Sequence, residues 1–396
     1  MSAPIAVYVH LPWCVSKCPY CDFNSHAAPG TIPENAYVEA LLADLEADLD
    51  LAAGRGVSSV FLGGGTPSLF GPQAIHALLS GIAARLPLAA DVEITMEANP
   101  GTVEHGRFEG YAAAGVNRVS LGAQSFDAAA LSALGRIHGP AEIPAAVAGI
   151  RSAGIDNFNL DLMYGLPGQS PEGALADLRA ALALAPAHLS HYQLTLEPGT
   201  AFYRRPPQLP GEEQAFEMQL ACQHELAAAG IAQYEVSAYA RPGRQCRHNL
   251  NYWRFGDYLG IGAGAHGKAT VDGAVIRSEK ARSPRAYLAA GGRAGTRRRV
   301  PAAELPFEYM LNALRLREGF TLAHFEAVTG LPAAAVEATL ARLCSRGLLR
   351  EMDGTYQPTE LGYRFLNELH AEFLPEETEP SAPRRVVHSA PAARFQ

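Results

Sequence analysis

The sequence predicts an α/β protein: a partial (β/α)6, TIM-like barrel followed by a C-terminal, mostly helical domain with a winged-helix-like pattern. Three observations carry this prediction. From Ile5 to about Ala240, short β-rich runs alternate with longer Ala- and Leu-rich stretches, which is typical of successive parallel βα units. Polar residues follow the ends of the short runs, where barrel active sites collect. After Ala240 the alternation stops, and a compact, mostly helical segment begins at Leu305.

The barrel elements are expected in strict alternation. We predict strands near Ala6–His10, Ser58–Leu62, Val92–Glu97, Arg118–Gly122, Asn157–Met163 and His188–Leu196, with a further one at Gln233–Tyr239. We predict the intervening helices at Glu34–Ala53, Pro72–Arg85, Val103–Ala114, Ala141–Ala153, Ser170–Ala185 and Gly211–Ala229. Six such units form a partial or complete barrel.

Four segments follow from this pattern. They are a barrel with a cysteine-bearing loop at 1–240, an aromatic element and basic connector at 241–300, a C-terminal domain at 301–375, and a tail at 376–396. In the third segment we predict helices at Thr321–Thr329 and Pro332–Arg346, then a small β wing at Gly347–Arg350 and Gly354–Gln357. The tail is rich in Pro, Glu and Ala and is expected to be disordered.

Three cysteines, Cys14, Cys18 and Cys21, form a C-x3-C-x2-C set in the first loop. Three thiolates can hold three irons of a 4Fe-4S cube and leave the fourth iron open to a substrate or cofactor. A disulfide framework is disfavoured, because the chain has six cysteines with the other three scattered, and no signal peptide precedes the set. Zinc with His10 or His26 as fourth ligand is the alternative, although neither stands at a usual zinc spacing.

Composition narrows the function classes. The net charge of −8 and pI near 5.9 argue against nonspecific nucleic-acid binding. No apolar stretch of about 18 residues or more is present, so no membrane span is predicted. The protein is expected to be cytoplasmic, where thiolates stay reduced.

One stretch is locally basic. Against a single acid, Glu279, it carries Arg277, Lys280, Arg282, Arg285, Arg293, Arg297, Arg298 and Arg299. Such a stretch is either a solvated, partly mobile connector or an anion-facing patch for carboxylates or a lipid surface, which would allow peripheral membrane contact.

Polar residues stand at the predicted C-terminal end of each strand. The cysteine loop follows the first strand and Gly63–Pro67, with the sequence GGGTP, follows the second. Glu97, Gln124, Asp161 and Thr195 end the next four. Each could be a structural residue, but together they aim at one mouth of the barrel, which predicts an active or binding site there.

The run from Tyr8 to Phe23, followed by GGGTPS, closely resembles radical S-adenosylmethionine enzymes. In that superfamily the methionyl amine and carboxylate chelate the fourth iron, and one electron from the cluster breaks the C–S bond to release a 5′-deoxyadenosyl radical. The glycines make physical sense, because a backbone without side chains can approach a ligand closely.

The resemblance narrows to the branch shared by oxygen-independent coproporphyrinogen III dehydrogenases and HemW-type heme chaperones, over about residues 5–370. It implies S-adenosylmethionine contacts at Tyr8, Gly64, Glu97, Arg136 and Asp161, and further residues around the same or a second ligand at Gly65, Thr66, Gln124 and Thr195. It also offers Tyr20 for stacking on the adenine. His266, which stands where the dehydrogenase pattern has an apolar residue near the cofactor, is a weaker candidate both for this site and for heme ligation. The alternative for Glu97, Arg136 and Asp161 is a structural ion network.

Three features favour the chaperone side of this branch. The dehydrogenases carry a fourth cysteine where this chain has Phe23, and they have a long N-terminal segment, whereas the first strand here begins by residue 6. Residues 248–253 read HNLNYW, the HNxxYW motif of the chaperones. Neutral imidazole is a common heme ligand, so His248 is the candidate axial ligand, and Tyr252 and Trp253 offer faces for the porphyrin. The Cys246 thiolate is an alternative ligand.

The predicted function is therefore that of a heme chaperone with a 4Fe-4S cluster and S-adenosylmethionine as cofactors and heme as cargo. Heme-accepting proteins such as membrane respiratory enzymes are the expected partners, and a homodimer is left open. The alternatives are a dehydrogenase that decarboxylates coproporphyrinogen III propionates and a nucleic-acid-modifying radical enzyme. The predicted second winged helix offers only Arg342 and Arg346 as cations, so an interaction or lid module is expected there and no nucleic acid. No catalytic residue is assigned.

Overall fold

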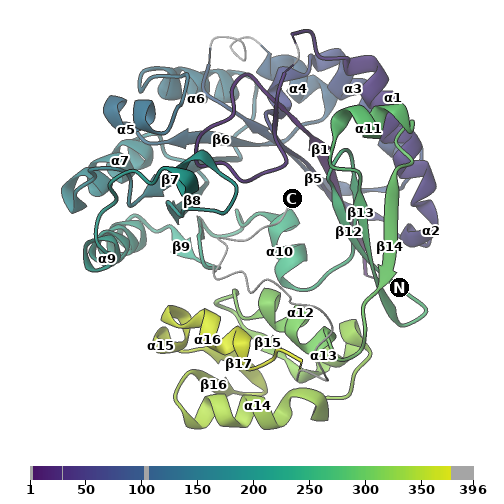
Figure 1. The fold of residues 1–396 in the computed structure, drawn as a ribbon, viewed down its shortest axis with the longest axis vertical. Coiled ribbons are helices and arrows are strands. Elements are labelled where there is room, and N and C mark those ends of the chain that lie inside the picture. The colour runs from purple at the N-terminus through teal and green to yellow at the C-terminus, as the bar shows by residue number, and fades with distance from the viewer. Residues whose placement is uncertain (1–2, 29, 102–106, 376–396) are drawn as a thin grey trace.

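The computed structural model describes residues 3–28, 30–101 and 107–375. It consists of a long curved sheet flanked by helices and a smaller domain with its own three-stranded sheet (Figure 1). The predicted α/β class, partial barrel and C-terminal helical domain are confirmed. The predicted disordered tail, 376–396, lies outside the described residues.

Six consecutive parallel strands form the barrel part of the sheet. They are β1 (Ile5–Leu11), β4 (Val57–Gly64), β5 (Leu88–Ala98), β6 (Arg118–Gln124), β7 (Phe158–Tyr164) and β8 (His188–Gln193). Helices on the outer side of this sheet are α1 (Glu34–Ala47), α2 (Leu49–Ala52), α3 (Pro72–Ala83), α4 (Phe108–Ala114), α5 (Ala128–Ala133), α6 (Glu142–Ser152), α7 (Pro171–Ala183) and α9 (Glu212–Ala228) (Figure 1). The six strands were predicted because strands covered on both faces read as apolar runs.

Local sequence explains where these elements start. All seven residues of β1, IAVYVHL, are buried, as expected for a central parallel strand. Helix α7 begins with Pro171 after Ser170, whose side chain accepts a hydrogen bond from the backbone N–H of Gly173. The apolar faces of the strands and helices then share one large core that includes Val7, Val60 and Leu160.

Two predicted barrel elements differ in the structure. The strand predicted at Gln233–Tyr239 is two short strands, β9 (Ala232–Gln233) and β10 (Ala238–Ala240), and β10 is antiparallel to β8. A turn interrupts the run because Glu235 is buried there and accepts a hydrogen bond from Arg315 of the C-terminal part, 2.8 Å away. The predicted helix Val103–Ala114 begins in residues outside the described ranges, and its described part is α4.

The basic stretch is a sheet rather than a connector, which corrects the first interpretation. Strands β11 (Tyr258–Ile261), β12 (His266–Val271), β13 (Ala274–Lys280) and β14 (Gly295–Arg299) extend the sheet beyond β1, with α11 (Pro284–Ala289) before β14. We call β12, β13 and β14 the sheet extension.

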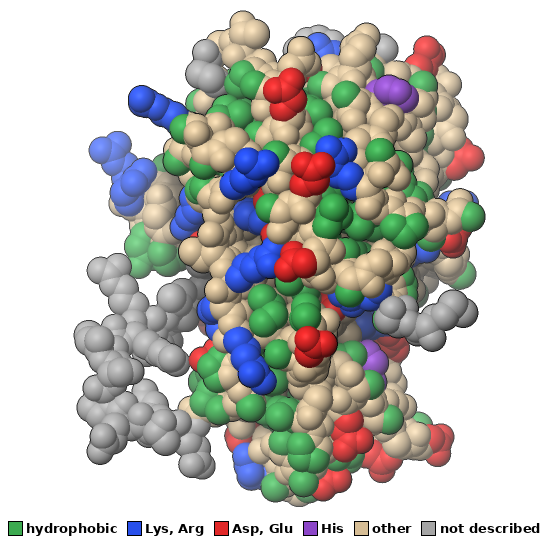
Figure 2. Space-filling view, turned by 90° about the vertical axis from the view of Figure 1, so that its right-hand side faces the viewer, with side chains coloured by type: hydrophobic (Ala, Val, Ile, Leu, Met, Phe, Trp, Pro, Cys, Tyr) green, Lys and Arg blue, Asp and Glu red, His purple; other side chains and the backbone are tan. Residues whose placement is uncertain are grey.

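Acids far away in the sequence neutralise several of the basic side chains. Lys280 lies 2.6 Å from both Asp44 and Asp48 of the first barrel helices, and Arg297 binds Asp48 and Asp50. Figure 2 shows the side of the molecule that carries β14, where basic and acidic side chains are interspersed. The local excess of cations in the sequence is thus partly balanced in three dimensions.

The C-terminal domain has its own apolar core. It contains α12 (Leu305–Ala313), β15 (Phe320–Thr321), α13 (Leu322–Thr329), α14 (Ala334–Ser345), β16 (Leu349–Met352), β17 (Thr355–Pro358), α15 (Glu360–Arg364) and α16 (Leu366–Ala371). Tyr309, Phe325 and Leu340 are central to this core. The two helices and the β wing lie as predicted. No helix in the described ranges is long and apolar enough to cross a membrane.

Candidate cluster and cofactor site at the barrel mouth

A cavity of about 340 Å³ opens at the C-terminal ends of the barrel strands, and we call it the mouth pocket. Most of the predicted site residues line it: Cys14, Cys18, Tyr20, Cys21, Gly64, Gly65, Thr66, Glu97, Gln124, Arg136, Asp161 and Thr195. The parallel topology explains this convergence, because the carboxyl ends of parallel strands meet at one edge.

The cysteine loop joins β1 to α1 and is held by a short parallel pairing of β2 (Trp13–Cys14) with β3 (His26–Ala27). Each thiol is half-buried and has a polar neighbour. The Thr66 hydroxyl donates to the Cys14 sulfur at 3.5 Å, Ser25 Oγ lies 3.6 Å from the Cys21 sulfur, and Arg136 donates to the Cys18 sulfur at 3.8 Å. Burial raises the pKa of the Cys14 and Cys21 thiols, so both are protonated at neutral pH until iron binds.

This donor set fits a 4Fe-4S cluster. In the described part of the chain, no three His, Cys, Asp or Glu side chains gather closely enough to hold one metal ion. A cube does not need that arrangement, because each thiolate binds a different iron. His10 is not available as the fourth ligand of a zinc site, because its ring nitrogens lie 3.0 Å from the Tyr8 hydroxyl and 3.1 Å from the Asn24 carbonyl.

The glycines of the GGGTP loop are required by close packing. Gly64 has a φ of +112°, and a Cβ there would come within 2.5 Å of the His10 ring. A Cβ on Gly65 would come within 2.6 Å of the Trp13 carbonyl oxygen. The loop therefore packs directly against the start of the cysteine loop and keeps its own backbone at the pocket wall.

Glu97 and Asp161 form an acidic pair at the mouth pocket. Burial and then the charge of Asp161 raise the pKa of Glu97 to about 8. Burial also raises the pKa of Asp161, against hydrogen bonds donated by Asn159 at 2.7 Å and Ser120 at 3.1 Å. Two desolvated carboxyls side by side favour a cationic ligand, since a positive charge would stabilise both carboxylates.

Arg136 and Gln124 are fixed by residues that sequence reasoning missed. Arg136 donates to the Asn99 side-chain oxygen and, at 2.9 Å, to the Gly122 carbonyl, while Asn99 donates to Thr66 at 2.9 Å. Gln124 accepts a hydrogen bond from the Tyr192 hydroxyl at 2.7 Å. Asn99 stands two residues beyond Glu97 at the same strand end, so its position was the signal available in the sequence.

Gln124 also has an unusual backbone. Its φ is +65°, in the left-handed region, and the pairing of β6 with β7 shifts register between Leu121 and Gln124. A bulge with such a backbone costs about 1 kcal/mol or more and is common beside functional sites. The strain turns this side chain toward the mouth pocket.

Two predicted cofactor contacts lie elsewhere. Tyr8 is buried and lines a separate cavity of about 140 Å³ that shares Gly64, Glu97 and Asp161 with the mouth pocket, so it borders the site from inside the barrel. His266 does not reach the mouth pocket. It is the first residue of β12 and lines a different cavity from the other predicted S-adenosylmethionine contacts.

The HNxxYW motif forms α10 (Arg247–Trp253), which packs against β4. His248 is only 1% exposed, with Nδ1 3.0 Å from the Ser59 hydroxyl and Nε2 2.9 Å from the Tyr252 hydroxyl. Burial lowers the pKa of His248 to about 3. Both ring nitrogens are hydrogen-bonded in this conformation, so axial ligation by His248, which stays a prediction, requires one of these hydrogen bonds to break.

The remaining heme candidates are equally enclosed. Tyr252 is 5% and Trp253 is 3% exposed; Tyr252 borders the 140 Å³ cavity together with His248, and Trp253 borders the mouth pocket, so neither ring presents a wide open face to a porphyrin. Burial raises the pKa of the Cys246 thiol to about 12. The motif was recognisable in the sequence, but the sequence analysis predicted neither that it forms a helix nor which way that helix faces.

The chain matches two family models. Residues 8–181 match the radical SAM superfamily, and residues 300–365 match the HemN C-terminal domain. It is 52% identical over 374 residues to "Heme chaperone HemW" of Escherichia coli K12, covering 94% of this chain and 99% of that protein. The corresponding protein of Haemophilus influenzae is 48% identical over 379 residues, with the same coverage.

The chain belongs to the HemW family. Membership of the radical SAM superfamily implies a 4Fe-4S cluster and S-adenosylmethionine. "Radical S-adenosyl methionine domain-containing protein 1, mitochondrial" of Bos taurus is 39% identical, covering 81% of this chain and 75% of that protein. Coproporphyrinogen III oxidase (HemN) from E. coli shares the fold, with a TM-score of 0.79 at 22% identity, covering 93% of this chain and 90% of that one.

Proposed function

We propose that this protein is a heme chaperone, which binds heme and hands it to acceptor proteins such as membrane-bound respiratory enzymes. One observation carries the proposal: over nearly its whole described length the chain is 52% identical to a protein named heme chaperone HemW, and it spans 99% of that relative. Phe23 after the third cysteine and the HNLNYW run point the same way.

We further propose how the mouth pocket holds its cofactors. Cys14, Cys18 and Cys21 would each bind one iron of the cluster, and the fourth iron would take the amine and carboxylate of S-adenosylmethionine. When bound, the cluster supplies a single electron at this site. Arg136 stands beside the Cys18 sulfur, where its positive charge would lie next to the negatively charged cluster, and Glu97 and Asp161 would face the cationic parts of the cofactor.

The other lining residues would position the cofactor. Gly64, Gly65 and Thr66 bring their backbone to the pocket wall, and Tyr20 offers a half-buried ring for the adenine. Gln124, the last residue of β6, and Thr195, which follows β8, would contact the cofactor from these two strand ends. Tyr8 supports this wall from inside the barrel.

A hemin titration of the purified full chain tests the proposal. It is done anaerobically on cluster-free and cluster-loaded protein, followed by mixing with a heme-free respiratory cytochrome subunit in nanodiscs. We expect saturable binding of about one heme per chain and spectral transfer to the acceptor. Absence of saturable binding in both forms would sink the proposal.

The likeness of the fold to coproporphyrinogen III oxidase favours one alternative, radical decarboxylation of coproporphyrinogen III propionates. The reconstituted protein is therefore also assayed anaerobically with coproporphyrinogen III, S-adenosylmethionine and a reductant. If the protein is a heme chaperone, no protoporphyrinogen IX should form. Stoichiometric turnover would instead show that the protein is a coproporphyrinogen III dehydrogenase.

A further inference from the structure

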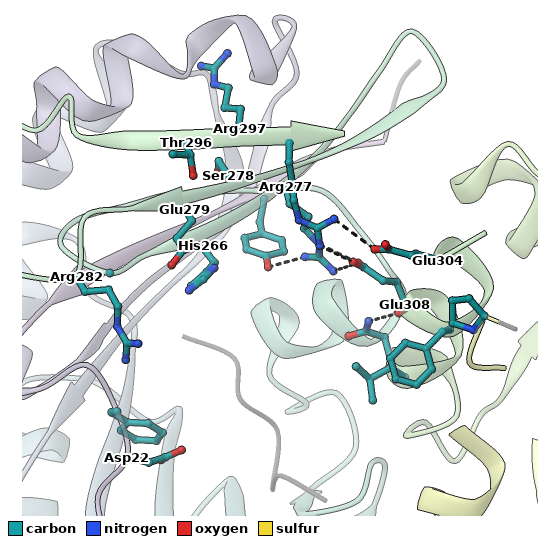
Figure 3. A pocket seen from close by; sticks show the side chains of 18 of the residues that line it. Asp22, His266, Arg277, Ser278, Glu279, Arg282, Thr296, Arg297, Glu304 and Glu308 are labelled. Carbon is teal, nitrogen blue, oxygen red and sulfur yellow. Dashed lines mark hydrogen bonds and ion pairs between the residues drawn. The ribbon is translucent and has the colours of Figure 1, made fainter. Parts of the chain in front are cut away.

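A second and larger cavity lies beside the barrel, between the sheet extension and α12, and we call it the side cavity. Its volume is about 830 Å³, which is in the range of small-molecule sites. Figure 3 shows His266, Glu279 and Arg282 on one wall and Glu304 and Glu308 on the other. The side cavity is large enough for a molecule the size of heme.

His266 is the exposed histidine of this cavity. Its side chain makes no hydrogen bond with the described residues, and it lines the side cavity beside Glu279 and Arg282 in Figure 3. Its backbone is fixed, because it pairs with Glu279 across β12 and β13 and its carbonyl lies so close to Gly260 that a Cβ there would clash at 1.8 Å. A fixed backbone with a free imidazole is suited to an axial metal bond.

The imidazole is also in the right chemical form. Partial burial lowers the pKa of His266 below its ordinary value, and the nearby Arg277 and Arg282 charges act in the same direction against Glu279. Neutral imidazole is the form that binds heme iron. Glu279 stands directly across from His266 in the strand register, where its carboxylate can accept a hydrogen bond from the N–H of the other ring nitrogen when iron is bound.

Two cations that could bind carboxylates line the side cavity together with the histidine. Arg282 follows β13, is exposed and has no ion pair in the described ranges, and Figure 3 shows its guanidinium below His266. Arg298 is 58% exposed and lies 3.4 and 3.5 Å from Glu304 and Glu308, contacts loose enough to be exchanged for a ligand. Arg297, by contrast, points away toward α1 and α2.

Apolar side chains complete the cavity. Phe23 is 45% exposed and Leu374 is 54% exposed, while Phe307 and Leu311 of α12 are half-buried. Large apolar side chains left in contact with water around one cavity indicate a ligand with apolar faces. Asp22 and Phe23 line both the side cavity and the mouth pocket, so the two sites share one segment of the cysteine loop.

We propose that the heme cargo binds in the side cavity, with His266 as its axial ligand, its faces against Phe23 and Phe307, and its propionates on Arg282 and Arg298. The proposal rests on the proposed function, since it says where the cargo of that function sits. Under this proposal, His248 is a structural residue of the barrel interior. Asp22 and Phe23, which line both cavities, connect the heme site to the cysteine loop.

Anaerobic hemin titrations of the full chain test this site. The variants are His266→Ala, His248→Ala and, as a matched surface control on α9, His224→Ala, each checked for native folding by circular dichroism. We expect His266→Ala to weaken binding at least tenfold and to lose the histidine-ligated heme spectrum, with the spectrum restored by free imidazole. His248→Ala and His224→Ala should keep that spectrum.

Three outcomes distinguish a failure of the proposed heme site from a failure of the proposed function. Wild type that fails to bind hemin refutes the proposed function itself. Wild type and His266→Ala that bind with the same spectrum, while folded His248→Ala loses it, keep the function and overturn this site. A His266→Ala spectrum that imidazole does not restore also contradicts axial ligation, because a cavity left by the ligand should accept imidazole.

Discussion

The mouth pocket and the side cavity differ in how their polar groups are satisfied. In the mouth pocket, Arg136, Asn99 and Thr66 form a hydrogen-bonded chain, and Gln124 is held by Tyr192. In the side cavity, Arg277 is paired with Glu308, but the side chains of His266 and Arg282 make no hydrogen bond or ion pair with the described residues. Fixed side chains suit cofactors that stay, and free side chains suit a cargo that arrives and leaves.

The same contrast separates the two histidines. His248 is buried with both nitrogens bonded, while His266 is exposed with both nitrogens free in the described part of the chain. A motif that is recognisable in the sequence therefore need not contain the residue that touches the ligand. The predictions below test whether the two sites, which share Asp22 and Phe23, bind their ligands independently.

The largest expected effect comes from removing one cluster ligand in the mouth pocket while leaving the side cavity unchanged. Cys18→Ser should abolish the 4Fe-4S cluster, because three thiolates are the minimum that this loop supplies. Hemin affinity of the variant should stay within about threefold of cluster-free wild type, less than 1 kcal/mol. Iron and sulfide analysis and the hemin titration measure both, with Cys344→Ser as the control that keeps the cluster. Loss of hemin binding in Cys18→Ser would show that the two sites are one.

His248→Ala should cost stability rather than heme ligation. Removing the ring deletes its hydrogen bonds with the Ser59 and Tyr252 hydroxyls and opens a cavity, so we expect a loss of roughly 2–4 kcal/mol in the free energy of unfolding. His224→Ala, on the surface, should change it by about 0.5 kcal/mol or less. Urea unfolding of the cluster-free proteins measures the difference, and equal midpoints would contradict the structural role.

The acidic pair predicts a pH dependence of the empty mouth pocket. Glu97 has a folded pKa of about 8 against an ordinary value of 4.5, so the folded state holds the extra proton between these values. Stability from this group is therefore fully present below pH 4.5 and is lost as the pH rises through 8. Glu97→Gln should stabilise cluster-free protein more at pH 8 than at pH 6, by on the order of 1–2 kcal/mol. The same gain at both pH values in urea unfolding would refute the shift.

The smallest effect is expected at the rim of the side cavity. Arg282→Ala should weaken hemin binding about three- to tenfold, roughly 1 kcal/mol, because it removes one exposed charge. The dimethyl ester of hemin, which lacks carboxylates, should bind both forms alike, and Arg285→Ala on α11 serves as the matched control. An equal loss for hemin and its diester would mean that Arg282 does not meet a propionate.

The parts of the molecule that sequence predicted share a physical cause. The six parallel strands are apolar runs buried on both faces, and their topology alone carried Glu97, Gln124, Asp161 and Thr195 to one mouth. The three cysteines and the glycine loop were evident from their spacing. The winged-helix-like pattern of the C-terminal domain followed from helices and a short wing in the expected order.

What sequence missed depends on contacts between distant segments. The sheet extension was taken for a connector because the partners of Lys280 and Arg297 lie more than 200 residues earlier, on α1 and α2. The orientation of His248 depends on Ser59 of β4, and the exposure of His266 depends on where α12 packs. No local pattern specifies these relations.

The most direct measurement is anomalous iron scattering from crystals of the hemin-loaded, cluster-loaded protein. Our account predicts two separate iron positions: the cluster at Cys14, Cys18 and Cys21, and a single iron bonded to the imidazole of His266 in the side cavity. A heme iron bonded to His248 beside α10, or lying in the mouth pocket with the cluster, would contradict it.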